Sequence, residues 1–187
     1  MYRDLLEHND LMVLSAPDGT KGLENWNRVG DANWRAEDGA IVADKGKGGF
    51  LVSKYMYKDF QIRAEFYAED NTNSGIFMRI QDVNKIGSAN SYEVNIYDRR
   101  GGQEYATAGI VDVANVPVPR IYSAANRWNT FDITVKGTQL TVVFNGVQTV
   151  DVRDSKFAEG PLALQFGNHG KEPGGAIKWR KVQVKPL

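Results

Sequence analysis

Alternation of apolar and polar residues dominates the chain from residue 34 onward. In DFQIRAEFYAE (residues 59–69), every second residue is apolar, and the residues between them are mostly polar or charged. Successive side chains of a β-strand point to opposite faces, so this period of two predicts strands with one buried face. The chain is therefore expected to bury these faces by packing one sheet against another.

The same pattern recurs in GIFMRIQD (75–82), SYEVNIYD (91–98), FDITVK (131–136), GPLALQFG (160–167) and GAIKWRKVQV (175–184). About ten short strands separated by Gly, Asn and Asp predict an all-β sandwich of two antiparallel sheets. Asn145-Gly146 lies between apolar runs and tolerates the positive φ angles of a tight turn, which predicts a hairpin. The apolar parity shifts between Trp179 and Val182, which predicts a bulge.

Two segments depart from the strand pattern. YRDLLEHNDLM (2–12) is expected to form at most a short accessory helix. The Gly-rich, charged stretch 98–126 is the longest departure, and loops of this length are usually functional or disordered. With 187 residues and no internal repeat, the chain is expected to form a single domain, 1–187.

Composition argues against several partners. Lys plus Arg equals Asp plus Glu at 23 each, so no general attraction to nucleic acid or anionic lipid is expected. The absence of cysteine excludes disulfides and thiolate chemistry. No apolar stretch is long enough to span a membrane, and the start of the given chain lacks the pattern of a signal peptide. Composition fixes neither the compartment nor the oligomeric state.

Three strand candidates carry polar groups on the face opposite their apolar residues. These are Arg63, Glu65 and Tyr67; Phe77, Arg79 and Gln81; and Glu93, Asn95 and Tyr97. Carboxylates, amides, guanidinium groups and aromatic rings are the groups that bind sugars, so one sheet face is expected to form a carbohydrate site. The same alternation equally describes the ordinary solvent-facing side of an antiparallel sheet.

Further candidates lie in the turns. Asn73 precedes a strand and either forms a simple turn or directs its amide into the site. His8 is expected to be structural or exposed, and His169 lies in a loop after a strand. No metal motif of fixed spacing is present, although the Asp- and Asn-rich run AEDNTNSG (68–75) leaves a calcium or other divalent-cation site open.

Seven motifs occur in an order that resembles a known family. They are WRAEDGAIV (34–42), GGFLVSKYMYKDFQIRAEF (48–66), NSGIFMR (73–79), YEVNIYD (92–98), RWNTFDITVKGTQLTVVFNG (127–146), GPLALQFGNHG (160–170) and IKWRKVQVKPL (177–187). Over about residues 12–187, the chain resembles the family called domain of unknown function 1080, associated with 3-keto-disaccharide hydrolase and 3-keto-glucoside 1,2-lyase/2-hydroxy-glucal hydratase activity. The resemblance implies a concanavalin A-like jelly roll and a bacterial periplasmic or secreted setting. Asn95 stands where the family commonly has Gln.

The order Glu93-x-Asn95-x-x-Asp98 is one carboxylate short of the E-x-D-x-x-E motif of laminarinase-type enzymes. Retaining glycoside hydrolysis needs two carboxyl groups about 5–5.5 Å apart, and Glu93 and Asp98 share a face only if a bulge intervenes. Cleavage of a 3-keto sugar does not require two carboxyl groups, because the ketone acidifies the C2 hydrogen. One base, one group that stabilises the enolate and one proton donor then suffice.

The resemblance, taken with face parity, implies roles for particular residues. Glu93 is expected to act as the base, Arg79 or a divalent cation to stabilise the enolate, and His169 or Asp98 to protonate the leaving oxygen. Substrate contacts are expected from Arg63, Glu65, Asn73, Asn95, Tyr97 and Gln165. A non-catalytic carbohydrate-binding module and a conventional glycoside hydrolase remain as alternatives.

Overall fold

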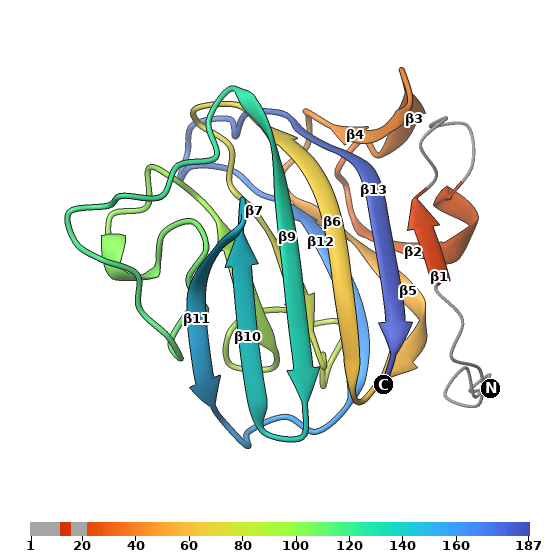
Figure 1. Ribbon diagram of the computed structural model, residues 1–187. Helices are drawn as coiled ribbons and strands as arrows, with labels where there is room; N and C mark the ends of the chain where they lie inside the picture. Colours follow the sequence, from red (N-terminus) through yellow and green to blue (C-terminus); the bar gives the residue numbers. More distant parts are fainter. Residues whose placement is uncertain (1–11, 16–21) are drawn as a thin grey trace.

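Two antiparallel β-sheets pack face to face in the computed structural model, which describes residues 12–15 and 22–187 (Figure 1). The larger sheet contains β1 (Met12–Ser15), β3 (Arg35–Glu37), β4 (Ala40–Ala43), β6 (Phe60–Ala68), β9 (Arg127–Lys136), β10 (Gln139–Phe144), β11 (Val147–Arg153) and β13 (Ile177–Pro186). The smaller sheet contains β2 (Trp26–Gly30), β5 (Gly49–Tyr57), β7 (Ser74–Met78), β8 (Tyr92–Ile96) and β12 (Gly160–Phe166). Two short 3₁₀ turns, η2 (Leu23–Asn25) and η3 (Gln103–Tyr105), complete the described elements. The predicted all-β sandwich is confirmed.

The larger sheet has the order β11-β10-β9-β6-β13-β4-β3, with β1 paired to β13. The smaller sheet has the order β2-β5-β12-β7-β8. Between them lies an apolar core in which the ring of Phe66 packs on those of Phe131 and Trp179. Burial of these apolar faces is the main force that holds the sheets together.

Two local sequence predictions are confirmed. Asn145 and Gly146 both have positive φ and connect β10 to β11 as a tight hairpin. The pairing of β13 with β6 shifts register between Trp179 and Lys181, which is the bulge that the parity change predicted. The helix expected over residues 2–12 and His8 lie outside the described residues, except for Met12, which begins β1.

One prediction about sheet neighbours is wrong. The three polar strand faces were expected to adjoin one another, but β6 belongs to the larger sheet, whereas β7 and β8 are neighbours in the smaller one. Each sheet turns its apolar face to the shared core, so their polar faces lie on opposite sides of the molecule.

The segment after β8 covers the edge of the smaller sheet. The backbone N–H of Asn95 donates to the backbone carbonyl of Gly109, and the backbone N–H of Val111 donates to the backbone carbonyl of Glu93. These bonds satisfy backbone groups that an edge strand would otherwise expose. The green to teal trace in Figure 1 shows the segment flanking the sandwich beside β11. Across the described residues, no helix has the length and apolar character needed to cross a membrane.

Candidate functional site

A row of residues on the outer face of the smaller sheet forms the base of the candidate site. Gly75 on β7 pairs with Asn95 on β8. On the other side of β7, the Leu164–Ile76 and Asn73–Gly167 pairs place Gly75 opposite Gln165 on β12. A glycine inside a strand often marks a close approach to a ligand or another backbone. Here it leaves a gap in the layer of side chains, bordered by Asn95 and Gln165.

Glu93 lies one row away, opposite Phe77, with its side chain partly exposed. Burial raises the pKa of Glu93 to about 7, the charge of Arg100 opposes this rise, and that of Asp112 adds to it. No side chain or backbone amide in the described part of the chain donates a hydrogen bond to this carboxylate. A half-buried carboxylate with a pKa near neutrality and free lone pairs suits a general base.

Arg100 is the cation of this site, and sequence reasoning missed it. Its charge opposes the rise that burial causes in the pKa values of Glu93 and Tyr97, so it lies within electrostatic reach of the two side chains. Its Nε atom is buried and lacks a hydrogen-bond partner among the described residues. The only signal in the sequence was the pair Arg99-Arg100 directly after the strand that carries Glu93.

Two amide oxygens beside Gly75 are also buried and unpaired within the described structure: Asn95 Oδ1 and Gln165 Oε1. Each such atom costs about 1–3 kcal/mol of stability unless a partner arrives. The Gln165 side chain is partly exposed, so a turn of its amide can present Oε1 to a ligand. Asn95 is fully buried, and its Nδ2 donates to the carbonyl of Tyr105, so it anchors the 98–126 loop to β8.

Tyr97 and His169 meet at the end of the site. The Tyr97 hydroxyl is hydrogen-bonded to Nδ1 of His169, and the two rings pack edge to face. Burial raises the pKa of Tyr97 above its ordinary value, with Arg100 opposing, so the phenol keeps its proton at neutral pH. Asn73, from the neighbouring strand end, donates from Nδ2 to the carbonyl of Asn168 and orients the loop that carries His169.

Asp98 does not share this environment. Its side chain is buried, and it accepts hydrogen bonds from Thr107 Oγ1, from Ser123 Oγ, and from the amides of Ala124 and Ala125. Arg120 lies 3.4 Å from its Oδ2. The carboxylate therefore fixes the two ends of the 98–126 loop to each other.

Arg79 was expected beside Glu93, but the structure places it elsewhere. Its φ of 53° ends β7 and turns the side chain away from the outer face. The buried guanidinium donates to the carbonyls of Lys58, Gly137 and Phe157 and to Asp59 Oδ1. All five of its donors are used in these bonds, so none remains for an enolate.

Arg63 and Glu65 also lie apart from Glu93, on the outer face of the larger sheet. Arg63 is exposed and lies 3.7 Å from Asp132, while Glu65 pairs with Arg180 and Lys181 at 2.6 and 3.3 Å. These are cross-strand ion pairs on a solvent-facing sheet surface. The expectation that they share a face with Glu93 is wrong.

The Asp- and Asn-rich run 68–75 was the candidate for a calcium site, but its two carboxylates are engaged in bonds within the protein. Glu69 accepts from the amide of Ala176, and Asp70 pairs with Arg99. The described residues contain no group of three or more His, Cys, Asp and Glu side chains placed to hold a metal ion.

The "Glu93 site" hereafter means Glu93, Tyr97, Arg100, Gln165 and His169 around Gly75.

Solved structures of other proteins share this fold. A crystal structure from Parabacteroides distasonis, of a protein provisionally assigned as a glycosyl hydrolase, is 21% identical, with a TM-score of 0.75 over 96% of this chain and 100% of its own. The carbohydrate-binding module CBM66 from Bacillus subtilis is 15% identical, with a TM-score of 0.65 over 86% and 95%. A Bacillus subtilis protein with a galectin-like fold is 10% identical, with a TM-score of 0.66 over 92% and 95%. These likenesses support the jelly-roll architecture.

No curated protein sequence matches the chain. A family model described as the 3-keto-alpha-glucoside-1,2-lyase-like domain matches residues 14–185. This match confirms the resemblance drawn from the seven motifs and marks the chain as a carbohydrate-related domain. Because it spans nearly the whole sequence, the chain belongs to the family of 3-keto-alpha-glucoside-1,2-lyase-like domains.

Proposed function

We propose that this domain cleaves 3-keto-glucosides by eliminating the group at C1 and then hydrating the product, with Glu93 as the base. The observation that carries the proposal is the Glu93 carboxylate, whose pKa is about 7 and which accepts no hydrogen bond within the described residues. Such a group is half ionised near neutral pH and has lone pairs free for a substrate proton. Membership of the family supports the same substrate class.

The chemistry follows from the ketone at C3. Glu93 takes the hydrogen from C2, and the electrons of that bond form an enolate with the C3 carbonyl before they form the C1=C2 double bond as the C1–O bond breaks. Negative charge develops on the C3 oxygen during this step, and Arg100 is the cation that acts on the same region. Arg100 thus takes the role that the sequence assigned to Arg79.

The departing oxygen needs a proton, and the Tyr97–His169 pair can deliver it. Tyr97 retains its phenolic proton because burial raises its pKa, and His169 is hydrogen-bonded to it. Water then adds hydroxyl to C1 and a proton to C2, which restores the 3-keto sugar. The net reaction is hydrolysis without any change of oxidation state.

A second function, carbohydrate binding without turnover, is supported by the likeness to CBM66. Conventional retaining hydrolysis has less support, because every oxygen of Asp98 is engaged in holding the 98–126 loop. A second free carboxylate is what that mechanism requires.

One assay separates the three functions. A glucoside and its 3-keto derivative are offered to the wild type and to Glu93→Gln, with and without chelator. Cleavage of the 3-keto form alone, abolished in Glu93→Gln and unaffected by chelator, is expected. Cleavage of the plain glucoside would favour a hydrolase, and saturable binding of either sugar without cleavage would favour a binding module.

A further inference from the structure

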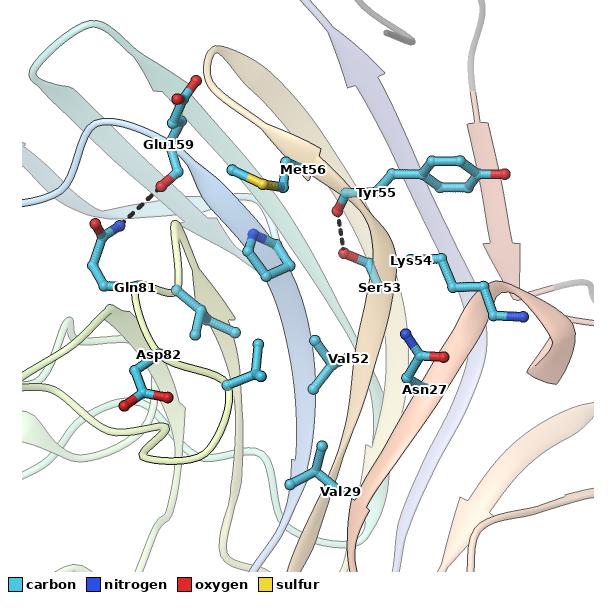
Figure 2. A pocket seen from close by; sticks show the side chains of 13 residues that line it. Asn27, Val29, Val52, Ser53, Lys54, Tyr55, Met56, Gln81, Asp82 and Glu159 are labelled. Carbon is cyan, nitrogen blue, oxygen red and sulfur yellow. Dashed lines mark hydrogen bonds between the residues drawn. The ribbon is translucent and has the colours of Figure 1, made fainter. Parts of the chain in front are cut away.

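A hollow of about 660 Å³ lies on the smaller sheet (Figure 2). Its lining residues Val52 and Ile80 cluster with Phe77, which pairs with Glu93, so the hollow is on the same outer face as the Glu93 site. It is formed by β2, the middle of β5, the turn after β7 and the start of β12. None of its lining residues belongs to the Glu93 site. Its volume falls in the range of pockets that bind small molecules.

The floor of the hollow is aliphatic and its rim is polar. Val29, Val52, Met56, Ile80 and Pro161 supply apolar surface. The polar rim contains Asn27, Lys54, Asp82 and Glu159, which Figure 2 places around the opening. An occupant with an apolar body and a few polar substituents fits this distribution.

The lining favours an aromatic occupant over a second sugar. Sugars are usually held against aromatic side chains, and Tyr55 is the one aromatic residue among the lining residues. Its ring points away from the opening (Figure 2) and packs against the main core. Aliphatic side chains and the thioether of Met56 instead make favourable contacts with a flat aromatic ring.

A continuous row of side chains connects the hollow to the Glu93 site. Gln165 pairs with Phe50 on β5, and Phe50 pairs with Val29 on β2. Neighbouring strands lie about 4.8 Å apart, so Val29 is about 10 Å from Gln165. Phe50 is partly exposed and is braced edge to face by Phe77, with 5.3 Å between the ring centroids. The row thus changes from polar to apolar along the sheet.

We propose that this hollow receives the aromatic leaving group of the substrate, which makes aryl 3-keto-glucosides the preferred substrate class. The sugar lies over Gly75 and Gln165, and the aryl group extends past Phe50 to Val29. This inference rests on the proposed function. It adds the chemical class of the group at C1, which the Glu93 site itself does not specify.

The test is Val29→Trp, which fills the hollow from an edge strand. Phenyl and methyl 3-keto-glucosides are compared in the wild type, in Val29→Trp and in the matched control Val147→Trp, an exposed position on the other sheet. In Val29→Trp, KM for the phenyl substrate should rise about 10-fold or more, with KM for the methyl substrate nearly unchanged. The control should alter neither.

A second test, titration with phenol followed by NMR, measures binding to the hollow and does not depend on catalysis. Phenol should shift the methyl signals of Val29 and Val52 in the wild type, and Val29→Trp should abolish the shift at Val52. Equal KM effects on both substrates, or no phenol binding by an active enzyme, would overturn the inference while leaving the proposed function intact. Failure of the wild type to cleave either substrate would overturn the proposed function, and the leaving-group assignment with it.

Discussion

Gly75 on β7 lies directly opposite Asn95 on β8, so one member of this cross-strand pair contributes no side chain to the outer face. A Cβ at Gly75 would lie 3.0 Å from the carbonyl oxygen of Val94 and 3.6 Å from Cγ of Glu93. The glycine therefore keeps the base of the Glu93 site open and the Glu93 side chain free to adjust.

Gly75→Ala should weaken substrate binding more than it weakens the fold. The methyl group would occupy the space beneath the sugar, and a misfit of this size typically costs about 10-fold or more in kcat/KM. Kinetics and thermal unfolding measured on the same preparations check this. Gly87→Ala is the matched control, because a Cβ there would meet no atom within 4 Å. A fall in stability with unchanged kinetics would contradict the role assigned to Gly75.

Activity should rise with pH through neutrality. The base must be ionised to take the C2 proton, and burial raises the pKa of Glu93 to about 7. The kcat/KM profile for a 3-keto-glucoside should therefore have an ascending limb with an apparent pKa of about 7. Arg100 opposes the rise in pKa, so Arg100→Met should move this limb to higher pH. An unchanged apparent pKa of the ascending limb in Arg100→Met would show that Arg100 does not act on Glu93.

Glu93→Gln should make the protein more stable at alkaline pH. The folded-state pKa of about 7 exceeds the ordinary value of 4.5, so the folded state binds this proton more tightly than the unfolded state does. Wild-type stability should fall as pH rises from 4.5 to 7. The free energy of unfolding of the wild type should fall by about 3 kcal/mol in total. Glu93→Gln should show no such fall, because its amide does not titrate. Denaturant unfolding at several pH values tests this, with exposed Glu104→Gln as a control that should track the wild type.

Arg79→Met should destabilise the protein without a specific effect on catalysis. The guanidinium joins the β5–β6 turn, the β9–β10 turn and the segment before β12 through carbonyl oxygens. Removing a buried charge from such a network costs about 3–5 kcal/mol. Arg63→Met, at an exposed ion pair, should cost less than about 1 kcal/mol. If initial rates normalised to the concentration of folded protein show a loss of kcat in Arg79→Met, Arg79 would have to contribute to catalysis.

The contrast between Glu93 and Arg79 shows what alternation can and cannot predict. Parity within a strand correctly placed Glu93 on the outer face, because β8 is regular. Parity failed at Arg79, where a left-handed backbone conformation ends the strand. It also could not tell that β6 belongs to the other sheet, because alternation gives the two faces of a strand but not its neighbours. Arg100 lies in a loop, where no periodicity applies.

Gln165→Leu should separate stability from function at one position. Gln165 Oε1 is buried without a partner among the described residues, so the unliganded protein bears the cost of that desolvated oxygen. Leucine has a similar shape and no polar atom, so the free energy of unfolding should stay constant or rise by about 1 kcal/mol. Substrate affinity should fall about 10-fold, because a bound sugar hydroxyl would lose its acceptor. The control Gln148→Leu, at an exposed position on β11, should leave substrate affinity unchanged. If Gln165→Leu kept the affinity of the wild type, Gln165 Oε1 would not contact the sugar.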